Sequence, residues 1–448
     1  MKQGDLTKGS VFRAISLFAL PMLLGNLLQQ MYNVVDTWVV GKYISSDALA
    51  GVGSAYTLMV FLTSILLGMC MGSGVVFSLC FGQKDEKKLK ESVGTAFLLI
   101  AAAAVILTLG AILLLDGILA WLNIPQEILG LTREYLFLVF LGIPAVFVYN
   151  FFAAYLKALG NALVPLVFLG ISTGVNIVCD LLFVISFEWG TAGAAGATVL
   201  AQYVSGIGLC AWVFIRDPAL RSAFAHIKSS RKGMREIAGY SVFTCLQQSV
   251  MNLGILMVQG LVNSFGTSIM AAFAAAVKID SFAYMPAQEY GNAFSTFIAQ
   301  NTGAGKRERV TGGIKCAALT SITYCMAASL ILWFQAENLM QIFVSASERT
   351  IIAEGVRYLH IEGAFYCGIG CLFLLYGFYR AIGKPAMSLI LTVISLGTRV
   401  ALAYLLSSVE SIGVVGIWWA IPIGWFLADT VGVGYMMVKR RLLWTKGR

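Results

Sequence analysis

The stretch "KDEKKLKESVGTA" at residues 84–96 has a counterpart in "GKRERVTGGIKCA" at residues 305–317, which lies 221 positions further along. Both stretches join a polar, charged turn to the start of an apolar run. Two more pairs recur at nearly the same offset: "SSDALAGVGSA" at 45–55 with "GTSIMAAFAAA" at 266–276, and "KALGNALVP" at 157–165 with "RAIGKPAMS" at 380–388. The chain therefore consists of two diverged copies of one unit.

The composition places these copies in a membrane. Hydrophobic residues make up 59% of the chain and charged residues 12%, and the mean hydropathy is +0.83. A soluble domain carries about a quarter charged residues. The apolar residues form runs of roughly 20 residues, the length of a helix that crosses a bilayer, and the runs are too long for barrel strands. We predict twelve such helices, at 12–40, 48–80, 92–115, 131–155, 163–186, 191–215, 235–262, 268–300, 311–334, 351–379, 386–408 and 412–438.

The net charge of +9 follows membrane topology rather than a nucleic-acid surface. Lys and Arg crowd the N-terminus, every second loop and the tail, whereas the intervening loops hold mostly Asp and Glu. This is the positive-inside bias, and it predicts that both termini are cytoplasmic. An even number of spans per copy gives both copies the same orientation. We therefore expect an all-α integral membrane protein with two six-helix lobes, related by a pseudo-two-fold axis along the membrane normal.

Three regions are predicted: an N-lobe at residues 1–215, a basic cytoplasmic linker at 216–234 and a C-lobe at 235–448. No segment is long enough for a soluble domain. The stretch "NTGAGKRERV" at 301–310 lacks the spacing of a phosphate-binding loop, and the sequence has no His/Cys metal spacing. We expect no enzyme activity, and we interpret the nine cysteines as small core residues.

The first predicted helix has one polar face. At 100° per residue, its Asn, Gln, Asp and Thr side chains fall within a narrow arc that includes Gln30, Asn33 and Asp36. A central Asp costs about 2.5–3.5 kcal/mol on insertion scales, so this face is expected to line a cavity or another helix.

Two further spans of the first copy contribute polar groups at a similar depth. In the fifth span, Asn176 and Asp180 are one turn apart, and the sixth span places Ala194, Thr198 and Gln202 on one stripe. Carboxylate, carboxamide and hydroxyl oxygens at one depth in the membrane can bind a proton or a small hard cation. The alternative is that both aspartates are hydrogen-bonded structural residues.

The second copy lacks these carboxylates. Arg399 stands at the position of Asn176, and Ala403 stands near that of Asp180. The sequence therefore predicts an ion site in the first half only. The second copy has its own buried charges, Lys278, Asp280 and Glu289, which either pair across helices or hold substrate.

Other side chains were selected by position. Pro21 lies inside the first span and is expected to kink that helix, with or without a hinge role. The further candidates for contact with substrate are Tyr32 and Asn150. The aromatic and Met-rich stretches are expected to pack against lipid or the protein core.

The sequence resembles the multidrug and toxic compound extrusion (MATE) transporters over essentially the whole chain. The resemblance rests on Pro21, "QQMYNVVDTWVVG" at 29–41, "FGQ" at 81–83, "ALGN" at 158–161, "NIVCDLLF" at 176–183, "GAAGAT" at 193–198 and the segment 274–306. It implies an outward-tapering V of two lobes that exports organic cations against an H⁺ or Na⁺ gradient. In the DinF-like branch the coupling ion binds the first lobe. The matching positions here are Asp36, Asn176, Asp180 and Thr198, together with the carbonyl of Ala194.

The NorM-like branch also uses carboxylates in its seventh and tenth helices. Here the seventh helix has Gln247 and Gln248, and we predict no carboxylate in the core of the tenth. The choice between H⁺ and Na⁺ stays open. We predict a monomeric antiporter of the cell membrane for drugs, dyes or toxins, with membrane lipid as its surroundings and no cofactor beyond the coupling ion. The alternative within the superfamily is a lipid-linked oligosaccharide flippase. A membrane enzyme or a binding-only receptor is a more distant alternative.

Overall fold

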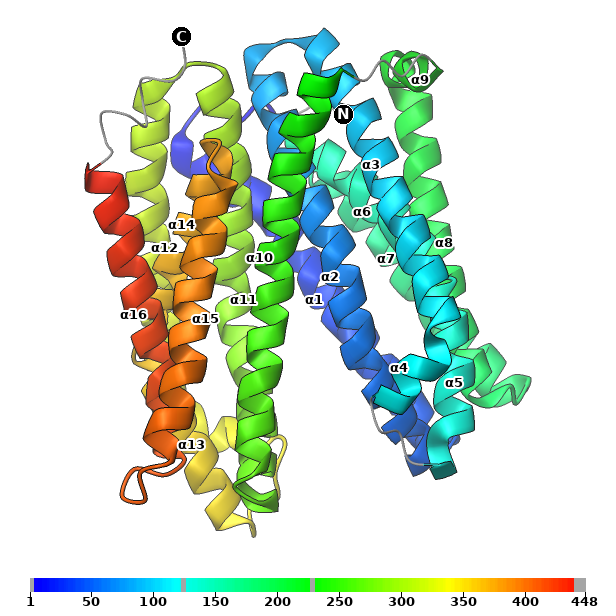
Figure 1. The fold of residues 1–448 in the computed structure, drawn as a ribbon, viewed down its shortest axis with the longest axis vertical. Coiled ribbons are helices and arrows are strands. Elements are labelled where there is room, and N and C mark those ends of the chain that lie inside the picture. The colour runs from blue at the N-terminus through cyan, green and yellow to red at the C-terminus, as the bar shows by residue number, and fades with distance from the viewer. Residues whose placement is uncertain (1–3, 122–125, 226–229, 439–448) are drawn as a thin grey trace. The chain divides into compact units, whose positions relative to one another are not determined.

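The computed structural model describes residues 4–121, 126–225 and 230–438, and it divides them into two compact units (Figure 1). The first unit is formed by residues 4–5 and 20–245, and the second by residues 6–19 and 246–438. The boundary thus falls inside α10 (Arg231–Asn263), beyond the predicted linker at 216–234. Part of that linker and the basic tail at 439–448 lie outside the described residues.

The first unit contains most of α1 (Val11–Tyr43) and the first part of α10. Between them it contains α2 (Ser46–Gln83), α3 (Glu86–Leu113), α4 (Leu115–Trp121), α5 (Gln126–Phe140), α6 (Ile143–Ala158), α7 (Leu163–Asp180), a π-helical turn η1 (Leu181–Ser186), α8 (Gly190–Arg216) and α9 (Pro218–Ala225). The second unit contains the start of α1 and the rest of α10. It also contains α11 (Thr267–Gly303), α12 (Arg307–Met340), α13 (Arg349–Gly363), α14 (Tyr366–Ala381), α15 (Pro385–Ser407) and α16 (Val415–Val438).

Ten of the described helices are long and apolar enough to cross a membrane on their own. Two bent pairs add one span each: α5 with α6, at 41°, and α13 with α14, at 53°. The prediction of twelve helical spans, six in each copy, is therefore confirmed. The two bends were not predicted.

The duplication is visible in the packing of each unit. In the first unit α2 packs against α3, α5 and α6, and α7 packs against α8. In the second unit the corresponding α11 packs against α12, α13 and α14, and α15 packs against α16. The backbone repeats as well, because Gly160 and Gly383, 223 positions apart, adopt φ values of +81° and +82°. A side chain is disfavoured at such angles, which explains why both copies have Gly at this turn.

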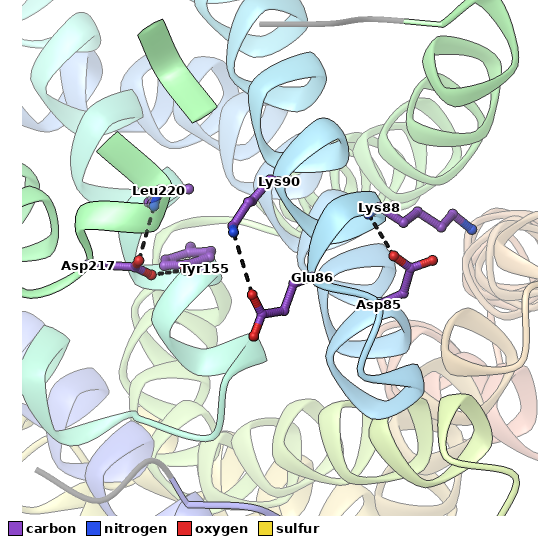
Figure 2. Close-up of polar contacts among 7 residues, drawn as sticks. All are labelled: Asp85, Glu86, Lys88, Lys90, Tyr155, Asp217 and Leu220. Carbon is purple, nitrogen blue, oxygen red and sulfur yellow. Dashed lines mark hydrogen bonds and ion pairs between the residues drawn. The ribbon is translucent and has the colours of Figure 1, made fainter. Parts of the chain in front are cut away.

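Local capping explains where several helices of the first unit begin. Figure 2 shows the side chain of Asp85, which accepts a hydrogen bond from the backbone N–H of Lys88 at 2.9 Å and so caps α3. Asp217 caps α9 by accepting from the N–H of Leu220, and its other oxygen accepts from the hydroxyl of Tyr155 at 2.6 Å. These contacts fix the ends of helices whose apolar faces pack together.

Two helices pass from one unit to the other. The first nine residues of α1 belong to the second unit, and the boundary falls two residues before Pro21. The start of α1 is held by Arg309, whose guanidinium donates to the carbonyls of Gly9 at 2.6 Å and Leu6 at 3.0 Å. The helix is continuous through Pro21, and a bend at this proline stays a prediction.

Candidate functional site

The polar face of α1 meets α7 and α8 inside the first unit. Tyr32 of α1 donates a hydrogen bond to the hydroxyl of Thr198 on α8 at 3.1 Å. One turn further along α1, Asp36 lies close enough to Asp180 on α7 for the two carboxylates to repel each other. These three spans therefore bring together four of the side chains that were selected from the sequence: Tyr32, Asp36, Asp180 and Thr198.

The two aspartates are buried. Asp36 is 8% exposed, and Asp180 and Asn176 are fully buried. Asn176 lies beside Asp180, but neither side chain makes a hydrogen bond of standard geometry. One oxygen of Asp36, both oxygens of Asp180 and both polar atoms of the Asn176 amide have no hydrogen-bond partner. Buried acceptors without donors are unfavourable, so the arrangement fits a proton or a cation held among these oxygens.

Local backbone structure positions Asp180. It is the last residue of α7, and the chain continues directly into the π-helical turn η1, where the N–H of Phe187 bonds to the carbonyl of Leu182. Wider turns of this kind are frequent at functional sites, since the extra residue re-aims the neighbouring side chains. Nothing in the apolar stretch "LLFVIS" distinguishes it from an ordinary helix, so the sequence did not predict this turn.

Tyr135 on α5 was missed by the sequence reading. Its side chain is 7% exposed and lies within electrostatic range of Asp36, Tyr32 and Asp180. A tyrosine in an apolar span carries no periodic signal of its own. The fold, and not the pattern, places its hydroxyl near the two carboxylates.

The other candidates of the first unit lie around this cluster. Ala194 is fully buried on α8, one turn from Thr198. Gln202, one turn further, lies against Gly142 at the break between α5 and α6, where an added Cβ would be 2.1 Å from its Oε1. Gln30 accepts a hydrogen bond from Asn33 at 3.4 Å on α1 itself. Asn150 does not join the cluster by any hydrogen bond described, because its amide donates to the carbonyl of Val146 within α6.

The charged candidates of the second unit all have neighbours within that unit. Lys278 lies over the ring of Phe343 at 5.9 Å. Asp280 accepts a hydrogen bond from the hydroxyl of Tyr366 at 2.5 Å. Glu289 accepts from Asn292, which in turn accepts from Arg380 at 3.0 Å.

One prediction about the tenth span is wrong. Glu362 lies near the break of the span formed by α13 and α14, and it is 1% exposed. Arg399 donates to its Oε1 at 3.5 Å. The predicted span at 351–379 contains Glu362 eleven residues from its start, but the sequence analysis did not single this residue out.

Comparison with known proteins identifies a family and named relatives. A family model described as MatE matches residues 21–182 and 241–405. A relative from Bacillus subtilis, described as probable multidrug resistance protein YpnP, is 28% identical over 88% of each chain. Another from Thermotoga maritima, described as probable multidrug resistance protein NorM, is 25% identical over 89% of this chain and 86% of its own.

Solved structures share the fold. A transporter of the MOP superfamily from Pyrococcus furiosus superimposes with a TM-score of 0.91 over 99% of both chains, at 22% sequence identity. An outward-facing MATE family transporter gives the same TM-score at 21% identity over 99% of each chain. At this level of identity the match establishes the helical architecture of this chain.

Proposed function

The chain belongs to the MatE family of membrane transporters, and from that premise we propose that it is an ion-coupled antiporter that exports organic cations and other amphipathic toxic compounds. Like the family and its named relatives, it is a transporter and not an enzyme. The names of the relatives support small-molecule drugs as the class of substrate.

The observation that carries the ion coupling is the buried acidic cluster of the first unit. Two carboxylates, Asp36 and Asp180, share one buried region with the amide of Asn176 and the hydroxyl of Thr198. If both carboxylates were ionised and nothing were bound, the bilayer would hold two uncompensated negative charges at a cost of several kcal/mol each. A bound H⁺ or Na⁺ removes this cost, and the oxygen-only donor set suits either ion.

Alternating access gives the cluster its role. An ion can shift the equilibrium between outward-facing and inward-facing states only through its different affinity for the two states. We propose that the ion enters from outside, binds Asp36 and Asp180, and favours the inward-facing state. A cationic substrate would compete for the same negative charge, and this competition would couple export to ion entry.

The proposal also covers the orientation of the chain in the membrane and its oligomeric state. The basic residues of alternate loops support cytoplasmic termini in the cell membrane, and six spans per unit keep both copies in the same orientation. We propose a monomer surrounded by lipid, with H⁺ or Na⁺ as the only cofactor.

The test is ethidium uptake into inverted vesicles, or ethidium transport in proteoliposomes, under a pH gradient and a Na⁺ gradient applied separately. Asp36→Asn and Asp180→Asn should each abolish gradient-driven efflux, whereas Asp116→Asn, at an exposed site on α4, should leave it unchanged. Wild-type efflux in the Asp36→Asn protein would overturn the proposed coupling site. Equal dye binding without any gradient-driven movement would indicate a receptor.

A further inference from the structure

The turn η1 and the start of α8 approach each other so closely that a side chain would crowd the backbone. Gly193 lies in the first turn of α8, and an added Cβ would be 3.0 Å from the carbonyl oxygen of Phe183 and 3.1 Å from its carbonyl carbon. The same oxygen accepts a hydrogen bond from the backbone N–H of Trp189 at 2.9 Å. We call the contact between Gly193 and Phe183 the glycine tie, because it fixes η1 against α8.

A second tie joins α7 to α8 further along both helices. The hydroxyl of Ser172 on α7 donates a hydrogen bond to the carbonyl of Ala201 on α8 at 2.8 Å. The candidate ion-site residues of both helices lie between the two ties: Asn176 and Asp180 on α7, and Ala194 and Thr198 on α8. A change at either tie therefore alters the distance between the oxygen atoms of the two helices.

The two copies share the glycine tie but differ in the backbone beside it. Leu406 and Gly416 stand 223 residues after Phe183 and Gly193, and an added Cβ on Gly416 would be 2.9 Å from the carbonyl carbon of Leu406. In the second copy α15 is an α-helix as far as Ser407, whereas the equivalent residues of the first copy form η1. Of these two described segments, only the one that follows Asp180 has the wide turn.

The turn after Asp180 is held in a conformation that is unfavourable on its own. Glu188, between η1 and α8, has a φ of +55°, which a residue other than glycine rarely adopts. The rings of Phe183, Phe187 and Trp189 pack together around it, with centroids 4.9 to 6.0 Å apart. Strained residues of this kind persist where their surroundings hold them, and they cluster at functional sites.

We propose that Gly193 and the turn η1 position Asp180 for the coupling ion. The turn sets the direction of the Asp180 carboxylate, and the glycine tie sets its distance from the oxygen of Thr198 on α8. An ion held by oxygens of two helices binds tightly only if both sets lie at the right distance. Gly193 is thus a positioning residue that touches no ion and still determines the affinity. The positioning role rests on the ion coupling proposed above.

The substitution Gly193→Ala should force η1 and α8 apart. Ordinary contacts of a Cβ atom begin near 3.4 Å, so the 3.0 Å contact requires a shift of about 0.4 Å. The atoms of Phe183 that it meets are backbone atoms, which cannot rotate aside. Binding groups must be held within about 0.5 Å of their productive geometry, and changes outside the ligand shell typically weaken metal binding about 10–100-fold.

The test is direct ion binding to the purified full-length protein, measured as binding of radioactive Na⁺ at constant pH and as H⁺ uptake in a potentiometric titration. The ion held at the site is the part of either signal that Asp180→Asn removes. Gly193→Ala should weaken this binding about ten-fold.

Two glycines provide matched controls. Gly196→Ala lies three residues further along α8, and its added Cβ would be 3.9 Å from a ring atom of Phe183, which is an ordinary contact. Gly416→Ala crowds the equivalent tie in the second copy, so it reports the effect of crowding without a change near Asp180. Both variants should bind the ion as the wild-type protein does.

Three results would overturn the proposal: unchanged ion binding in Gly193→Ala, an equal loss in Gly416→Ala, or no binding of either ion that depends on Asp180. If Gly193→Ala fails to fold, Ser172→Ala decides the question by loosening the other tie. It should weaken ion binding several-fold, and unchanged binding would then refute the positioning role. Thr173→Val is its control, because the hydroxyl of Thr173 bonds within α7 to the carbonyl of Leu169.

The binding measurement is independent of transport. If neither gradient drives ethidium transport while Gly193→Ala still weakens ion binding, the proposed function fails and the positioning role stands. If the wild-type protein transports ethidium and Gly193→Ala binds the ion normally, the positioning role fails and the proposed function stands.

Discussion

The substitution Gly72→Ala tests the packing of α2 against the first part of α10 in the first unit. A Cβ on Gly72 would lie 2.4 Å from the carbonyl oxygen of Tyr240 and 2.8 Å from the Cα of Ser241. Both are backbone atoms, so no side chain can move aside. The two helices would have to separate by about 1 Å to restore ordinary contact distances.

This displacement lowers the free energy of unfolding in two ways. Overpacking of a close contact typically costs about 1–3 kcal/mol. The separation would also stretch the hydrogen bond between Ser73 and Ser241, now 2.9 Å, which is worth about 1 kcal/mol. Ala is favoured over Gly in a helix by about 1 kcal/mol, which offsets part of this cost. We therefore expect Gly72→Ala to lower the free energy of unfolding by about 1–3 kcal/mol.

The measurement is equilibrium unfolding in detergent micelles, followed by circular dichroism. Gly53→Ala is the matched control on the same helix, because its added Cβ meets no described atom within 4 Å beyond its own part of the helix. Ala is favoured over Gly in a helix by about 1 kcal/mol, so this control should be neutral or stabilised. Equal stability of Gly72→Ala and the control would refute the close contact between α2 and α10.

Two further substitutions probe single contacts. Tyr32→Phe removes the hydroxyl that bonds to Thr198, and it should weaken binding of the coupling ion several-fold, seen as a higher ion concentration for half-maximal efflux with an unchanged maximal rate. Arg309→Gln removes the donors to the carbonyls of residues 6–9, and hydrogen exchange in those residues should become faster. An unaltered exchange rate would show that Arg309 does not hold this segment.

The sequence predicted the spans well because each is a long apolar run between charged turns. The predicted run at 386–408 corresponds to α15 at Pro385–Ser407, and the run at 48–80 lies within α2 at Ser46–Gln83. The breaks at residues 141–142 and 364–365 were missed. Hydropathy reports how apolar a segment is and says nothing of its direction, so a bend within an apolar run leaves no signal.

The same reasoning separates the site residues that were found from those that were missed. Asp36 and Asp180 stand out because a carboxylate in an apolar span is costly and needs an explanation. Tyr135 is compatible with any apolar environment, and only the packing of α5 brings it to the aspartates. Glu362 lies well inside its predicted run at 351–379, and only the structure shows that it is buried and that it contacts Arg399.

The structure changes the interpretation of the asymmetry between the two copies. The sequence comparison set Asp36 and Asp180 against Gln, Arg399 and Ala403, and it predicted ion binding in the first half only. The structure adds Glu362 beside Asp280, next to that same Arg399. Each copy thus holds a pair of buried acids, and the pairs differ in whether a cationic side chain accompanies them.

The central claim is that ion binding at Asp36 and Asp180 drives export, and gradient-driven ethidium transport in proteoliposomes of the Asp180→Asn protein tests it most directly. The account predicts that a pH gradient or a Na⁺ gradient drives export by the wild-type protein, and that neither gradient drives it after the substitution. Export by the Asp180→Asn protein at the wild-type rate under the same gradient would contradict the account.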